Sequence, residues 1–262
     1  MTHEHMSKTT DIQRLDEIHH SQQSSVAKDC KTERRGFIVK TVSRKNPDHT
    51  DVWDKATVQD IAQGFRQSVH ILKKSSSCLA AYIPPTRIQV LDADTIQVVQ
   101  YEIDGQTIAQ IGHAVKSRDG DNLAILSKRL SVSLNALFLD CLHFAIQSTT
   151  YDETDMPRAI TFTGHPVMRH PKKGEAVMPE IIAGNGMTNI MFGTLVRNQS
   201  TEWKEPRVWI SDVTGLALID KTVVDKGIFQ LLQNGLIEGG ISPSILDPNV
   251  QQMCFELEKH IQ

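Results

Sequence analysis

The side chains best suited to chemistry gather in one short segment, residues 164–174. It holds two histidines and three cations among prolines and glycines, namely His165, Arg169, His170, Lys172 and Lys173. Histidine moves protons near neutral pH, and guanidinium and ammonium groups bind phosphate. A carboxylate from elsewhere in the chain, such as Asp212 or Asp220, would complete a hydrolase or transferase site for a phosphate-containing substrate. In that interpretation the catalytic candidates are His165, His170 and Asp212.

The same segment is also typical of a solvated loop between two strands. The two histidines are five residues apart, so they share neither a helix face nor a strand face. The segment contains no HxH or HExxH metal motif. A third interpretation is anion binding without catalysis, through Arg169, Lys172 and Lys173.

The other candidate motifs lack the neighbouring residues or the structural context that their chemistry requires. The Gly-rich stretch 183–187 matches no phosphate-binding fingerprint and favours a hairpin or bulge. Glu202 and Lys204 flank a tryptophan as in some metal-dependent nucleases, but they lie in a polar loop. Cys141 lies among leucines and is expected to be buried and inert. We therefore expect neither a metal site nor a cofactor.

A basic run is the clearest charge asymmetry in the chain. It is interrupted only by two acidic residues, and it comprises Lys28, Lys31, Arg34, Arg35, Lys40, Arg44 and Lys45. A basic segment beside a folded domain is typical of a nucleic-acid or other polyanion contact. A solvated junction is the alternative.

Composition excludes several classes of protein. The chain has 262 residues and a net charge of −3, so a basic footprint over the whole protein is absent. Its four cysteines form no CxxC pair, which argues against a zinc ribbon. The start is polar, and no apolar run approaches the roughly 18 residues that span a bilayer. We expect a cytoplasmic protein without a transmembrane segment.

Residues 1–35 and residues 36–262 differ in pattern. The first part is polar and poor in core-forming residues, which favours a flexible arm; apolar residues within 10–19 suggest a short helix as an alternative. Deleting this arm is expected to leave the melting temperature of the remainder within a few degrees. The second part is expected to be a single domain, with a subdivision near residue 150 as the alternative.

Periodicity predicts the elements of residues 36–262. Strands are expected at 37–42, 87–91, 96–103, 106–113, 159–163, 176–182, 189–196, 207–211 and 216–219. Asp104-Gly105 is expected to turn a hairpin of type I′ between two of them. Helices are expected from Thr57 to about residue 75, over 122–147, over 222–233, and after the cap Asp247-Pro248.

The predicted strands come in runs and do not alternate strictly with helices as in βαβ units. This order favours an α+β fold. We predict antiparallel sheets packed on a long buried helix at 122–147, with two C-terminal helices and the flexible N-terminal arm.

Because no catalytic motif is complete, we favour a non-catalytic intracellular binding or assembly protein that self-associates. It would contact nucleic acid or another polyanion through Lys28, Lys31, Arg34, Arg35, Arg44 and Lys45. The alternative is the phosphate-directed enzyme with its site at 164–174.

Overall fold

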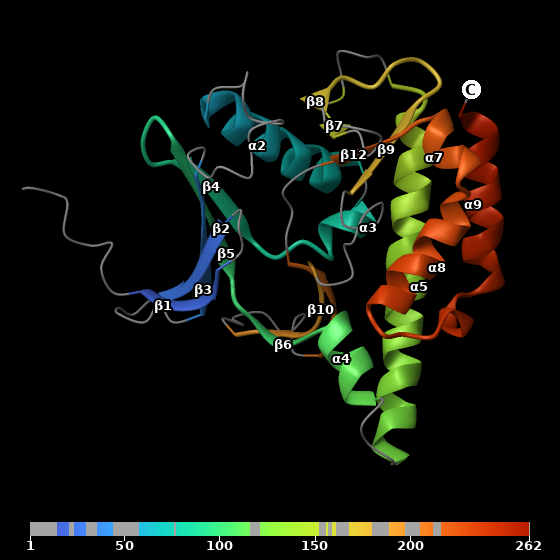
Figure 1. Ribbon diagram of the computed structural model, residues 1–262, viewed down its shortest axis with the longest axis horizontal. Helices are drawn as coiled ribbons and strands as arrows, with labels where there is room; N and C mark the ends of the chain where they lie inside the picture. Colours follow the sequence, from blue (N-terminus) through green and yellow to red (C-terminus); the bar gives the residue numbers. More distant parts are fainter. Residues whose placement is uncertain are drawn as a thin grey trace, which may run out of the picture.

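The computed structural model describes a large part of the chain. The described residues are 15–20, 24–29, 36–43, 58–75, 77–115, 121–151, 156, 159–160, 168–179, 189–196, 205–211 and 216–261. A five-stranded sheet lies on one side of the molecule, and the long C-terminal helices lie on the other (Figure 1). Two smaller sheets join these parts. The fold is α+β with mainly antiparallel sheets, as predicted.

The five-stranded sheet is antiparallel throughout, in the order β1-β2-β3-β5-β4. Its strands are β1 (Leu15–His20), β2 (Ser24–Asp29), β3 (Phe37–Ser43), β4 (Thr86–Val90) and β5 (Thr95–Tyr101). Strands β1 and β2 lie within residues 1–35, the segment predicted as a flexible arm. The alternative of a helix is wrong for residues 15–19. Strand β2 pairs with β3 and β1 pairs with β2, so backbone pairing places these polar segments in the sheet although they lack a strong apolar pattern of their own.

Helix α2 (Val58–Ser75) covers the inner face of this sheet. Its buried residues include Val58, Val69 and Leu72, which recur at helical spacing. Arg66 of α2 donates two hydrogen bonds, of 3.1 and 3.0 Å, to the carbonyl oxygen of Ile88 in the outermost strand β4. The helix is thus fixed to the sheet by burial and by a polar contact at the sheet edge.

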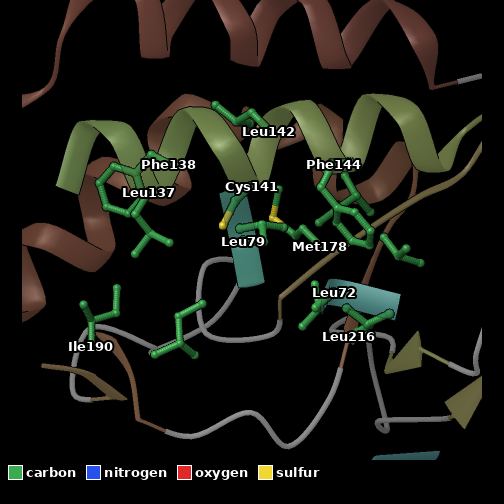
Figure 2. Close-up of a cluster of buried hydrophobic side chains, with 14 of the residues drawn as sticks. Leu72, Leu79, Leu137, Phe138, Cys141, Leu142, Phe144, Met178, Ile190 and Leu216 are labelled. Carbon is green, nitrogen blue, oxygen red and sulfur yellow. The ribbon is translucent and has the colours of Figure 1, made fainter. Parts of the chain in front are cut away.

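Helix α5 (Asp121–Ser148) is the central element of the core, as predicted for 122–147. Leu137, Phe138 and Cys141 are fully buried on it, and Figure 2 shows them packed with Leu79 and Met178. Leu79 comes from α3 (Ser77–Ala80), a short helix that follows α2. One apolar cluster therefore joins segments far apart in the sequence.

The three-stranded sheet corrects the predicted hairpin at Asp104-Gly105. Its order is β11-β10-β6, from β6 (Ile103–Thr107), β10 (Ile190–Leu195) and β11 (Arg207–Ile210). Gly105 lies within β6, directly opposite Gly193 of β10. A Cβ on Gly105 would collide with the Phe192 carbonyl oxygen, so glycine permits close strand approach here instead of a turn.

Residues 108–113, the larger part of the strand predicted at 106–113, belong to helix α4 (Ile108–Val115). The apolar residues Ile108 and Ile111, which strand pairing was expected to bury, are buried at helical spacing instead. A short apolar run does not distinguish a strand from a buried helix.

A four-stranded sheet in the order β8-β7-β12-β9 lies against α5. Its strands are β7 (Ala159–Ile160), β8 (Met168–Arg169), β9 (Ala176–Pro179) and β12 (Leu216–Ile219). The pairing of β7 with β12 is parallel, and the other pairings are antiparallel. The buried hydroxyl of Ser148 donates to the Ala145 carbonyl and accepts from the Val177 amide at 2.9 Å, which links the end of α5 to β9.

The C-terminal region contains α7 (Lys221–Asp225), α8 (Ile228–Glu238), the 3-10 turn η4 (Pro243–Ile245) and α9 (Pro248–His260). The helix predicted at 222–233 is in fact two, broken at Gly227, where φ is +80°. Helix α8 also continues past residue 233, where the predicted helix ends, and Gly235 is buried within it. The predicted start of α9 is confirmed: the Asp247 carboxylate accepts from the Asn249 amide at 2.8 Å.

Deleting residues 1–35 is now expected to destabilise the protein and promote self-association. The deletion removes β2, so β3 becomes an edge strand with unpaired backbone groups. Thermal melting and size-exclusion chromatography will measure both effects, with deletion of residues 1–14 as the matched control because it retains β1 and β2. A 1–35 deletion that melts and elutes like this control would show that β1 and β2 contribute nothing to the sheet.

Candidate functional site

The loop between β8 and β9 holds a bidentate ion pair. Nη1 and Nη2 of Arg169 donate to the two carboxylate oxygens of Glu175 at 2.6 and 2.7 Å. The same carboxylate accepts the backbone N–H of Lys172 at 2.7 Å. The loop is short, and these three contacts close it between the end of one strand and the start of the next.

The ion pair shifts both ionisations toward the charged forms. The hydrogen bond to Glu175 raises the pKa of Arg169 despite its partial burial, and the nearby charges of Glu175 and Asp220 add to the rise. Burial alone would raise the pKa of Glu175. The hydrogen bonds from Arg169 and Lys172 outweigh it, so this pKa is lowered.

The ion pair with Glu175 occupies Arg169, which the sequence analysis suggested as a phosphate-binding residue. Arg169 presents its guanidinium fork to Glu175, the geometry by which it would otherwise hold a phosphate. His170 is exposed, and its Nδ1 lies 2.9 Å from the Met156 carbonyl oxygen, so the neutral ring carries its proton on Nδ1. Lys172 and Lys173 are exposed at the turn.

Of the remaining members of the predicted enzyme site, Asp220 lies close enough to Arg169 for its charge to raise the pKa of that guanidinium. His165 and Asp212 lie outside the described residues. Asp220 caps helix α7, where its Oδ1 accepts the backbone N–H of Val223 at 3.1 Å. Of the candidates, the described part of the chain therefore groups Arg169, His170, Lys172 and Lys173 in one loop.

Glu175→Gln is expected to lower the free energy of unfolding at pH 7 by about 1–3 kcal/mol, because it leaves a half-buried guanidinium without its charged partner. The folded-state pKa of Glu175 lies below its ordinary 4.5. Its stabilisation is therefore full above the unfolded pKa and is lost as the pH falls through the folded one. The wild type and the variant should differ in urea unfolding at pH 7, and the difference should shrink as the pH falls below the ordinary pKa of 4.5 and vanish below the lower folded-state pKa.

Glu256→Gln is the matched control for this titration. It removes an exposed ion pair to Lys259 of 3.0 Å, and exposed pairs contribute little to stability. An effect of Glu175→Gln that equals the control at pH 7 would contradict a stabilising role for the β8–β9 loop.

The buried ionisable groups of the core are held in their neutral forms. The Tyr82 hydroxyl donates to the Asp140 carboxylate at 3.0 Å; burial, followed by the charge of Asp140, raises the pKa of Tyr82. Burial also raises the pKa of Cys141, and it raises that of Cys254 to about 12. Both thiols are therefore protonated and poor nucleophiles, in agreement with the prediction that Cys141 is buried.

The described ranges hold no candidate metal centre. Among those residues, no cluster of three or more His, Cys, Asp or Glu side chains has a geometry that could hold a metal ion.

The basic run lies along the β2–β3 hairpin. Lys28 belongs to β2 opposite Ile38, and Lys40 belongs to β3 opposite Val26. These two lysines are thus one diagonal step apart on neighbouring strands. The run continues through the β2–β3 connection and past the end of β3; its members there, which lie outside the described residues, are Lys31, Arg34, Arg35, Arg44 and Lys45.

A second polar surface was missed by sequence reasoning. The pairing of β3, β5 and β4 places an aromatic pair, two glutamines and an arginine on the sheet face opposite α2. They are Phe37, Tyr101, Gln89, Gln97 and Arg87. The sequence predicted these strands, but it did not predict the strand order that brings the five residues together.

No protein-family model matches the chain, and no curated protein sequence matches it.

One described segment, Lys128–Ser148 of α5, is long and apolar enough to cross a membrane by length and composition. It corrects the prediction that no apolar run approaches that length. It is weak evidence for a span, because the core helix of a soluble protein passes the same test and 44% of this window is buried inside the structure.

Proposed function

We propose that this protein is a non-catalytic binding or assembly protein that contacts nucleic acid or another polyanion through the basic run of residues 28–45. The observation that carries the proposal is the register of β2 and β3. It sets Lys28 and Lys40 on adjacent strands, with five further cations next to those strands in the chain. A polyanion is attracted to such a concentration of charge through counterion release.

The proposal of an enzyme acting on phosphate-containing substrates has less support. Its loop contains exposed Lys172 and Lys173, but the Arg169 guanidinium is occupied by Glu175 at both of its terminal nitrogens. A substrate phosphate would have to displace a carboxylate that three donors already hold. Release of Arg169 by Glu175→Gln would make the same loop a better phosphate site.

The test of the proposal is direct binding. Fluorescence anisotropy with labelled single-stranded DNA, duplex DNA and RNA, and co-sedimentation with anionic liposomes, should detect at least one complex at low salt. The complex should dissociate as salt rises, because its free energy comes mainly from counterion release. Absence of binding to all of these polyanions at low salt would overturn the proposal.

The same preparations address self-association and the enzyme alternative. Size-exclusion chromatography with light scattering should show an oligomer if assembly is part of the function. Turnover of a generic phosphate ester that is abolished by His170→Ala would instead favour the enzyme, since that substitution leaves the basic run intact.

A further inference from the structure

The two edges of the five-stranded sheet differ. At the β4 edge, Arg66 of α2 donates two hydrogen bonds to the carbonyl oxygen of Ile88, so a backbone acceptor of that strand is already engaged. The other edge is β1, and among the described strands β2 is the one that pairs with it. In Figure 1, β1 lies on the side of the molecule away from α5 and α9. An edge strand of this kind offers its backbone groups to a further strand.

A β-bulge in β1 decides which of its residues share a face of the sheet. The register with β2 sets Asp16 opposite Lys28 and His19 opposite Val26, with a shift between Glu17 and His19. Lys28 and Val26 are two residues apart on β2 and therefore lie on the same face. Asp16 and His19 share that face with them. In a regular strand, residues three apart would lie on opposite faces, so the bulge brings this acid and this histidine to the same side.

The other face of β1 combines the same two residue types. Glu17 lies opposite Ala27 and His20 lies opposite Ser25, and these partners are again two residues apart on β2. Each face of β1 therefore carries an acidic residue that is followed along the chain by a histidine. This order is self-complementary. When two copies of the strand run antiparallel, the acidic end of one copy meets the histidine end of the other on both faces.

We propose that two copies of this protein associate by antiparallel pairing of their β1 strands, which joins their five-stranded sheets across a two-fold axis. The pairing is centred between Glu17 and Ile18. Asp16 of each copy then lies directly opposite His19 of the other, and Glu17 lies diagonally across from His20 of the other. The symmetry forms each acid–histidine pair twice. This inference rests on the assembly part of the proposed function and names the partner as a second copy of the chain.

The histidines make the pairing depend on pH. On the strand beside β1, the charged residues are Lys28, opposite Asp16, and Asp29, opposite Leu15. Their charges are of opposite sign, so β2 adds no net charge next to β1. Carboxylates and ammonium groups ordinarily keep their charges between pH 6 and pH 8, whereas histidine gains positive charge as the pH falls through this range. Acidification therefore supplies the positive half of each acid–histidine pair, and the dimer is tighter at pH 6 than at pH 8.

The experiment is analytical ultracentrifugation of the full chain at pH 6 and pH 8. Asp16→His sets histidine opposite histidine, and His19→Asp sets carboxylate opposite carboxylate. Each substitution should weaken the dimer about two- to 30-fold, the range for two lost cross-strand pairs. Both substitutions in one chain exchange the two residues, restore opposite charges and should recover the dimer. His143→Gln removes an exposed histidine on α5; it is the matched control and should dimerise like the wild type.

The outcomes separate this inference from the proposed function. A wild type that is monomeric at both pH values overturns the inference, whereas polyanion binding by that monomer would leave the proposed function intact. A dimer that is equally tight at both pH values also overturns it, and this comparison needs no substitution. The same holds for a dimer that Ile18→Pro leaves unchanged, because proline removes a backbone donor at the centre of the pairing. Circular dichroism melts check the fold of each variant.

Discussion

Replacing Phe138 or Leu137 by alanine is expected to lower the free energy of unfolding by about 2–5 kcal/mol. Both side chains are fully buried on α5, at the point where this helix meets α3 and the small sheets (Figure 2). Each substitution removes apolar contacts and leaves a cavity among rigid neighbours such as Leu79, which cannot close it completely. Urea unfolding followed by circular dichroism measures the destabilisation.

Val132→Ala on the same helix is the matched control. Its side chain is 65% exposed, so the change is expected to stay within about 0.5 kcal/mol. The buried and the exposed substitutions lie on the same helix, so they differ in burial and not in the element that carries them. A cost below about 1 kcal/mol for both Leu137→Ala and Phe138→Ala would mean that this part of α5 is an exposed partner surface.

The long helices were predictable because their signals are local and strong. Apolar residues recur around most of α5, one stripe runs along α2, and Asp247-Pro248 marks the start of α9. Each of these signals needs no knowledge of the rest of the fold. The break at Gly227 was missed because helix-forming residues lie on both sides of it. The identity of a residue as glycine does not predict whether its φ is positive or negative.

The pairing of strands was much less predictable. Asp104-Gly105 has the composition of a tight turn, yet Gly105 is needed for close approach to Gly193 on a strand more than eighty residues away. Strands β1 and β2 lack apolar alternation, so nothing local distinguished them from a mobile arm. The structure of such segments depends on pairing with strands that are distant in the sequence, and a single sequence does not reveal that pairing.

The same limit applies to the candidate sites. The sequence identified Arg169 and its neighbouring cations, but it did not predict the ion pair between Arg169 and Glu175. This pair forms only when the β8–β9 loop brings the two side chains together. The face that joins Tyr101 to Arg87 depends on the order β3-β5-β4. Charge and residue type were readable in advance, whereas the partner of each side chain required the fold.

Removing four cations from the basic run is expected to weaken polyanion binding and flatten its salt dependence. The variant replaces Arg34, Arg35, Arg44 and Lys45 by alanine. For every duplex phosphate that is no longer neutralised, the log–log salt slope should become less negative by about 0.9, or by about 0.7 for a single strand. The weakening should be similar for all base sequences, since phosphate interactions carry little sequence information.

A charge-matched control separates local contact from net charge. It replaces four exposed cations by alanine, three on helices and one at the C-cap of α7, namely Lys128, Arg129, Lys221 and Lys226. This control changes the net charge of the protein by the same amount but leaves the β2–β3 hairpin untouched. It should retain the wild-type salt slope.

The decisive measurement is therefore a salt titration of the wild type, the basic-run variant and the charge-matched control, with the same short DNA and RNA ligands. Contact through residues 28–45 predicts a steep slope for the wild type and the control, and a shallower slope with weaker binding for the basic-run variant. No detectable binding by the wild type at low salt, or equal slopes for all three proteins, would contradict it.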